Sequence, residues 1–221
     1  MDLLVLALII SVLSLDITIA FQVLISSPIF ACPLLGWILG DVWIGFEMGI
    51  LFQLLWLGRI PVGAYIMPEG NIASMIVTSL VILNREIGFP DTALAIVFIE
   101  GIIVSFIGAQ LTYFYRKLNG KILNLIESEV RRVHFNILVV LEISSIFNYF
   151  LMVFITSLII LKVNQYFLPL TIQYVGNLFE NQLVIVKPVI FGIGLASIIP
   201  IFQETVQGNS RKKSGQIPKD G

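Results

Sequence analysis

Polar side chains interrupt an otherwise apolar stretch of the chain, from residue 28 to residue 71. They are Asp41, Glu47, Gln53, Arg59, Glu69 and Asn71. An ionisable side chain near the centre of a bilayer costs roughly 2.5–3.5 kcal/mol, so such residues usually face protein or a water-filled cavity. Carboxylates and amides beside apolar or aromatic faces are the groups that bind a ligand with many hydroxyls. These residue types predict a polar binding site inside a membrane protein.

The candidate ligands of such a site are amides, acids and one aromatic ring. Trp37, Trp43 and Trp56 are possible ring faces, and packing or a place in an interfacial belt is the alternative for each. Asp41 follows Gly40, a position typical of a helix N-cap as well as of a ligand. The predicted ligand-binding set is Gln22, Gln53, Glu69, Asn71, Asp41 and Trp56.

Glycines and prolines punctuate the same stretch every few residues, more often than a regular spanning helix needs. Irregular backbone at membrane depth is tolerated where it is buried in protein or lines a cavity. The segments near Pro28, Gly45 and Ile72 are roughly a dozen residues long, short of the ~20 that cross the hydrocarbon, and are predicted to be half-helices inside protein. The predicted structural helix breaks are Pro28, Gly36, Gly40, Gly49, Gly58, Gly63 and Pro68.

The composition sets the fold class. Hydrophobic residues make up 57% and charged residues 12% of the 221 residues, and the mean hydropathy is +0.98. Soluble domains carry about 25% charged residues. We therefore predict an all-α, polytopic integral membrane protein with several spanning helices and short broken or re-entrant helices. The N-terminal segment lacks a basic region and contains Asp2 and Asp16, so it is predicted to be a retained helix and not a signal peptide.

Several kinds of chemistry lack their motifs in this sequence. A single cysteine, Cys32, excludes an intrachain disulfide framework and a cysteine-based metal cluster. The chain contains no nucleotide-binding loop of the type GxxxxGK[ST] and no HExxH, and His134 is its only histidine. We expect no metal, no cofactor and no catalytic residue. The basic clusters have no interleaved aromatic residues, so nucleic-acid binding is not expected.

Basic residues gather at 116–132 and 211–219, and the positive-inside rule places both clusters in the cytoplasm. Residues 116–133 are predicted to form an amphipathic helix on the cytoplasmic surface. An outer turn around Lys162–Gln165 and a returning segment Leu183–Phe202 would then leave the C-terminus inside. The predicted regions are 1–115, the motif-rich N-terminal membrane region; 116–133, the cytoplasmic loop; 134–204, the C-terminal membrane region; and 205–221, a disordered cytoplasmic tail.

Three strings carry a family resemblance: SPIFACPLLGWILG at 27–40, followed by Asp41; GILFQLLWLGRIPVGA at 49–64; and MPEGNIASMIVTSLVI at 67–82. Their order resembles the membrane component IIC of the mannose family of the sugar phosphotransferase system, and LLWLGRIPVGA is similar to its shorter members. The chain departs from the family pattern at three positions. Ser27 stands where an arginine is usual, Gln53 where a glutamate is common, and Glu69 where an aspartate is usual.

The resemblance implies a sugar-translocating subunit in the lipid bilayer of a bacterial plasma (inner) membrane. It implies a second membrane subunit, IID, and cytoplasmic subunits IIA and IIB, which carry the phosphorylated histidines, in an oligomeric assembly. The family's elevator-like movement suits short broken helices around a midplane site. Two alternatives stay open: a non-transporting assembly or regulatory subunit derived from that scaffold, and a proton-coupled transporter that uses Asp16, Glu47 and Glu100 as a relay.

Overall fold

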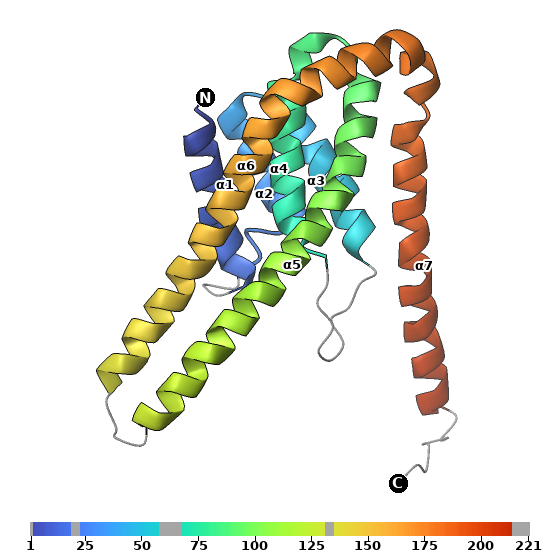
Figure 1. Ribbon diagram of the computed structural model, residues 1–221. Helices are drawn as coiled ribbons and strands as arrows, with labels where there is room; N and C mark the ends of the chain where they lie inside the picture. The colour runs from blue at the N-terminus through green and yellow to red at the C-terminus, as the bar shows by residue number, and fades with distance from the viewer. Residues whose placement is uncertain (1, 19–22, 58–67, 131–134, 214–221) are drawn as a thin grey trace.

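The computed structural model describes residues 2–18, 23–57, 68–130 and 135–213, with the backbone alone described at 121–130, 135–138, 141 and 200–213. These residues form an all-α structure, as the composition predicts (Figure 1). Its elements are α1 (Leu3–Thr18), α2 (Pro28–Leu39), α3 (Val42–Leu57), α4 (Gly70–Leu83), the 3-10 helix η1 (Arg85–Ile87), α5 (Pro90–Val130), α6 (Phe135–Leu183) and α7 (Val186–Lys213).

Short helices form an inner group, and long helices surround it. α2, α3 and α4 pack against one another, while α5 packs along α4 and α6 packs along α1 (Figure 1). α6 rises beside α5 and bends across the end of the molecule at which α5 begins, and α7 then descends along α3. The polar residues at the ends of α3 and α4 are therefore enclosed by helices from both halves of the sequence.

α2 and α3 form a tight antiparallel pair. Gly40 ends α2 with a φ of 87°, a left-handed conformation that glycine adopts without strain. A Cβ on Gly36 would lie 2.6 Å from the carbonyl oxygen of Asp41, and one on Gly49 would lie 2.6 Å from that of Pro28. Gly36 and Gly49 therefore lie within helices and allow the two backbones to touch, and neither of them breaks a helix.

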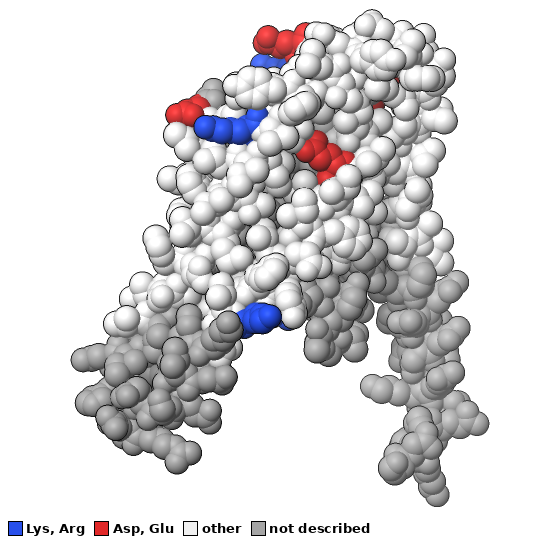
Figure 2. Space-filling view, viewed as in Figure 1, with Lys and Arg blue, Asp and Glu red and all other residues white. Residues whose placement is uncertain are grey.

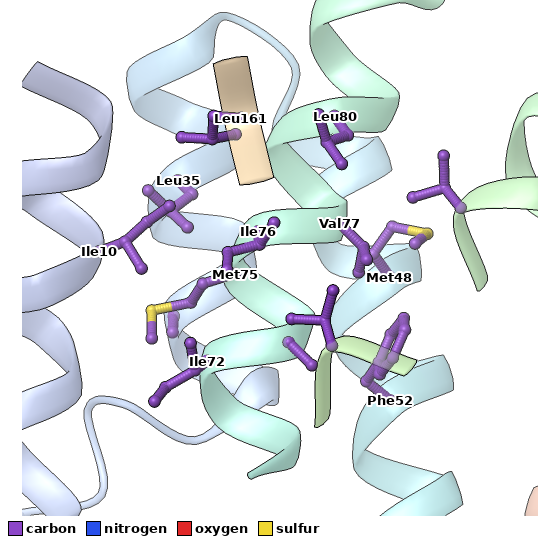
Figure 3. Close-up of a cluster of buried hydrophobic side chains, with 14 of the residues drawn as sticks. Ile10, Leu35, Met48, Phe52, Ile72, Met75, Ile76, Val77, Leu80 and Leu161 are labelled. Atoms are coloured by element: carbon purple, nitrogen blue, oxygen red, sulfur yellow. The ribbon is translucent and has the colours of Figure 1, made fainter. Parts of the chain in front are cut away.

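α4 is a short helix buried inside the protein. Eleven of its fourteen residues are buried. Figure 3 shows Met75 and Ile76 pointing towards the side of Leu35, and Val77 lying next to Met48 of α3. A helix that is buried on nearly every side is stable only when protein surrounds it. The predicted short helices inside protein are confirmed most clearly here.

The long helices differ from the sequence prediction. The predicted turn around Lys162–Gln165 is wrong, because α6 runs through it without interruption and the chain reverses only after residue 183. The polar character of this segment has another cause: Asn164 is buried, and its Nδ2 donates to Glu100 of α5 and to the carbonyl of Ile160 at 3.0 Å. The polar residue pairs two helices.

Two predicted regional limits fall inside helices. Residues 116–130 continue α5, which has no break at the basic cluster and is 41 residues long. They do not form a separate helix. Likewise α7 continues to Lys213, so residues 205–213 are helical where disorder is predicted. Lysine, arginine, glutamine and glutamate are good helix formers, which explains why a polar composition did not end either helix.

Among the residues that the structure describes, two helical stretches are long and apolar enough to cross a membrane, Pro90–Gly120 and Glu142–Leu183. The outer face of α6 exposes apolar side chains at every fourth position: Phe147, Leu151, Ile155, Ile159 and Val163. Figure 2 shows a flank that is largely uncharged: acidic and basic groups gather near the upper end, one acidic patch lies in the middle, and a basic patch lies near the lower end. This pattern is typical of a protein surrounded by lipid.

Candidate functional site

Glu69 lies at the start of α4 and is bound to α5 in two ways. Its backbone N–H donates to the carbonyl oxygen of Ser105 at 2.9 Å, and its Oε1 accepts a hydrogen bond from Oγ1 of Thr112 at 2.7 Å. The start of a buried helix is therefore fixed to α5 by a partly buried carboxylate.

Small residues on α5 allow this approach. A Cβ on Gly108 would lie 2.6 Å from the Cβ of Glu69, and one on Gly101 would lie 2.5 Å from the ring of Phe52. Gly101, Ser105, Gly108 and Thr112 recur at spacings of three and four, which places them on one helix face. These α5 residues were not among the predicted site residues, and their small-residue spacing is the signal that could have identified them.

Two side chains from the end of α3 complete the site. The indole of Trp56 lies directly against Gly70, because a Cβ on that glycine would collide with the ring. Gln53 lies one turn earlier on α3, and its Oε1 is buried without a hydrogen-bond partner among the described residues. Buried polar atoms almost always have a partner, so an orphaned one needs an explanation. A ligand hydroxyl would supply it.

The structure separates the predicted ligand set into two places. Glu69, Trp56 and Gln53 lie at the same end of α3 and α4, and Asn71 follows two residues after Glu69. Asp41 lies at the other end of α3, about 18 Å from Gln53 by helix rise. Its Oδ1 accepts from the N–H of Ile44 at 3.1 Å, so the helix N-cap alternative is confirmed. Gln22, Gly58, Arg59, Gly63 and His134 lie outside the described residues.

The other membrane acids each have a local partner. Asp16 accepts hydrogen bonds from the backbone N–H groups of Val23 at 3.0 Å and Ser26 at 3.3 Å. Glu47 forms an ion pair with Lys187 of α7. No contact among the described residues joins Asp16, Glu47 or Glu100 to another of the three, and no group of three or more His, Cys, Asp or Glu side chains there is placed to hold a metal ion.

Comparison with known proteins identifies the family. A family model described as the sorbose-specific IIC component of the phosphotransferase system (PTS) matches residues 1–205. The chain belongs to this family. It is therefore a membrane protein, and the motifs at residues 27–82 are those of a IIC component.

Curated relatives match parts of this IIC-family chain. The PTS mannose-specific EIIC component of Escherichia coli (strain K12) is 38% identical over 69 residues, which cover 31% of this chain and 26% of that protein. The PTS sorbose-specific EIIC component of Klebsiella pneumoniae is 29% identical over 119 residues, 54% of this chain and 42% of that protein. The matched region thus spans about a quarter to two fifths of these relatives.

Solved structures share the fold of this family member over nearly its whole length. One, described as a membrane protein, has a TM-score of 0.67 at 22% identity and covers 97% of this chain and 86% of its own. Another is a cryo-EM structure of the mannose transporter ManYZ with microcin E492, with a TM-score of 0.64 at 21% identity, covering 97% and 87%. The helical arrangement described above is therefore a known fold.

Proposed function

We propose that the chain is the sugar-translocating IIC subunit of a mannose-type, phosphoenolpyruvate-dependent phosphotransferase system. The observation that carries the proposal is the polar site at the start of α4, within a chain of this family. There a carboxylate tied to Thr112, an orphaned amide oxygen of Gln53 and the indole of Trp56 lie where two short helices end. A sugar needs this combination of hydrogen-bonding groups and a ring face.

The position of the site along α5 supports a cytoplasmic role. Thr112 lies one turn before Arg116 and Lys117, the start of the basic cluster that the positive-inside rule assigns to the cytoplasm. A sugar at Glu69 would then lie on the side of the membrane where phosphoryl transfer takes place. The chain is proposed to cross the inner membrane several times, with its C-terminus in the cytoplasm.

The partners follow from the family and not from contacts in this chain. We propose a second membrane subunit of the IID type, which the likeness to the mannose transporter ManYZ supports, and cytoplasmic IIA and IIB subunits. These would carry the phosphoryl group, and this chain would supply binding and movement. Proton coupling through Asp16, Glu47 and Glu100 is less well supported, since each acid is held by a different local partner.

The test is sugar uptake with phosphorylation in cells that contain the chain with its partner subunits. D-mannose and L-sorbose are the first sugars, because the matched relatives are named for them. Glu69→Gln keeps one acceptor oxygen and replaces the other by an NH2 donor, which leaves one hydroxyl without its acceptor; a loss of about 1–3 kcal/mol predicts uptake lower by roughly 5- to 150-fold. Glu86→Gln, an exposed acid on η1, is the matched control and should transport normally.

Three outcomes would contradict the proposal. Uptake that is unchanged in Glu69→Gln would remove this site from transport. Uptake that persists without the phosphoryl donor but stops when the proton gradient is collapsed would favour the proton-coupled alternative. Absence of uptake of any sugar, with the chain still assembled with its partners, would favour the assembly or regulatory subunit.

A further inference from the structure

A second polar region lies at the opposite end of α4. A cavity of about 320 Å³ is enclosed there by α3, the end of α4 with η1, the start of α5 and the start of α7. None of its lining residues belongs to the site around Glu69. Asn84, which lines the cavity, follows Glu69 by fifteen residues, which corresponds to about 20 Å of helix rise. The same buried helix therefore has a polar site at each end.

The charges around the cavity are arranged in pairs. Glu47 of α3 forms an ion pair with Lys187 of α7, and Asp41 forms one with Arg85 at 3.4 Å. Asp91 adds a third carboxylate. With three acids and two bases, the lining has no excess of positive charge that could attract a phosphorylated ligand, whereas a neutral ligand meets both donors and acceptors.

Two acceptors in the lining are unused. Asn84 donates through Nδ2 to the carbonyl oxygen of Leu80 at 2.8 Å, and its amide oxygen has no partner among the described residues. The carboxylate of Asp91 has no hydrogen bond there either, although its backbone N–H donates to Glu180 at 3.1 Å. Ligand hydroxyl groups could donate to both oxygens.

An aromatic face lies beside these acceptors. Phe89 lines the cavity, and its ring packs on Gly176 of α6, where a Cβ would collide with it. One turn further on, Glu180 accepts hydrogen bonds from the N–H of Thr92 at 3.0 Å and from its Oγ1 at 2.5 Å. α6 therefore fixes both the ring and the start of α5, which pre-organises this wall of the cavity.

We propose that this cavity is a second, outer subsite that binds the neutral, unphosphorylated sugar before it reaches Glu69. The inference rests on the proposed function. It adds a second binding place and specifies that the sugar bound there is unphosphorylated, and the proposed function requires neither. The cavity lies at the end of α5 away from Arg116 and Lys117, so it faces the outside if the basic cluster is cytoplasmic. Its volume is within the range of small-molecule sites.

The experiment labels an introduced cysteine in the assembled complex. Val81→Cys places a thiol in the cavity lining without removing either proposed acceptor, and native Cys32, which is fully buried, gives the background in the parent chain. A membrane-impermeant maleimide is applied to right-side-out vesicles, with D-mannose and L-sorbose as protecting probes and D-mannose 6-phosphate as the anionic control. Asn181→Cys, an exposed position at the end of α6, is the matched control, and Ile44→Cys, at another apolar lining position, is the second cavity variant should Val81→Cys not assemble.

The expected result is labelling from the outside that a bound sugar slows. At ten times the dissociation constant found by equilibrium dialysis, the labelling rate of Val81→Cys should fall about tenfold, while that of Asn181→Cys stays constant. The protection should persist when Glu69→Gln is added, because the two sites share no residue. D-mannose 6-phosphate should protect much less than the free sugar.

Other results would overturn the inference in distinguishable ways. If a sugar binds the complex but leaves Val81→Cys unprotected, the outer subsite is wrong and the proposed function stands. The same holds if labelling occurs only from the cytoplasmic side, or if Glu69→Gln abolishes the protection. Equal protection by D-mannose 6-phosphate refutes the preference for a neutral ligand. If neither sugar binds the complex by dialysis, the proposed function fails and the subsite fails with it.

Discussion

α4 and α6 are both apolar helices, but their surroundings are opposite. Eleven of fourteen residues of α4 are buried by other helices, whereas α6 exposes a stripe of large apolar side chains along much of its length. α4 also has polar sites at both of its ends. Apolar composition therefore identifies a membrane protein. Whether one of its helices can take part in a polar binding site depends on whether other helices surround it.

The physical reason is the cost of polar groups in hydrocarbon. A carboxylate such as Glu69 can lie beside a short helix because α5 provides Thr112 and excludes lipid. A comparable group on the outer stripe of α6 would lack such partners, and polar groups in lipid need partners inside the protein. The inner group can therefore hold polar chemistry, and the outer stripe is suited to contact with lipid or another subunit.

The largest expected effect contrasts isoleucines from the two environments. Ile76 of α4 is fully buried, whereas Ile155 of α6 is 47% exposed. Ile76→Ala should lower the free energy of unfolding by about 2–5 kcal/mol, because it leaves a cavity among rigid neighbours. Ile155→Ala should cost far less, since mobile lipid or detergent fills the space. Thermal unfolding of the purified complex in mild detergent measures both, and equal destabilisation would refute the contrast.

A smaller effect is expected at glycines. Gly108→Ala would place a Cβ 2.6 Å from Glu69, whereas Gly192 of α7 has open space around it. Overpacking typically costs about 1–3 kcal/mol, so Gly108→Ala should reduce both the unfolding temperature and sugar uptake. Gly192→Ala should be neutral or slightly stabilising, because alanine favours helix by about 1 kcal/mol over glycine. A Gly108→Ala protein with normal uptake would show that this close approach is not needed.

The fold class and the short inner helices could be predicted from the sequence. The apolar composition indicates the fold class, and the break at Gly40 marks the end of a short helix. Both are readable because a left-handed turn and a segment of a dozen residues depend only on neighbouring residues. The turn expected at Lys162–Gln165 shows the limit of local patterns. Asn164 is polar because it pairs with Glu100, and a partner 64 residues away in sequence leaves no local signal.

Only part of the candidate site could be predicted, because some of its residues stand out locally and others depend on partners distant in sequence. Glu69, Gln53 and Trp56 were found because polar and aromatic residues stand out in an apolar stretch and because that stretch resembles a known family. Thr112 and Gly108 were missed because a threonine and a glycine in a long apolar helix are typical of ordinary packing. Asp41 was grouped with the site by residue type, although α3 carries it to the other end of the molecule.

The smallest effect concerns two threonines. Oγ1 of Thr112 donates to Glu69 across two helices at 2.7 Å, and Oγ1 of Thr171 donates to the carbonyl of Phe167 within α6 at 2.8 Å. Valine has nearly the same shape and lacks the hydroxyl. Thr112→Val leaves the carboxyl group without its donor and should cost about 0.5–1.5 kcal/mol, because a partly buried acceptor loses its hydrogen bond.

Thr171→Val should change stability by less than about 0.5 kcal/mol, since Thr171 is exposed and the carbonyl that it contacts is already part of the helix. Both variants replace the same hydroxyl by a methyl group. A difference between them therefore reports where the threonine lies and not which atoms were changed. If Thr112→Val lowers sugar affinity as well as stability, the bond also orients Glu69 for the ligand. If both variants change stability by the same amount, the hydrogen bond from Thr112 does not stabilise the carboxyl group of Glu69. The contrast between the inner helices and the outer stripe then does not extend to polar groups.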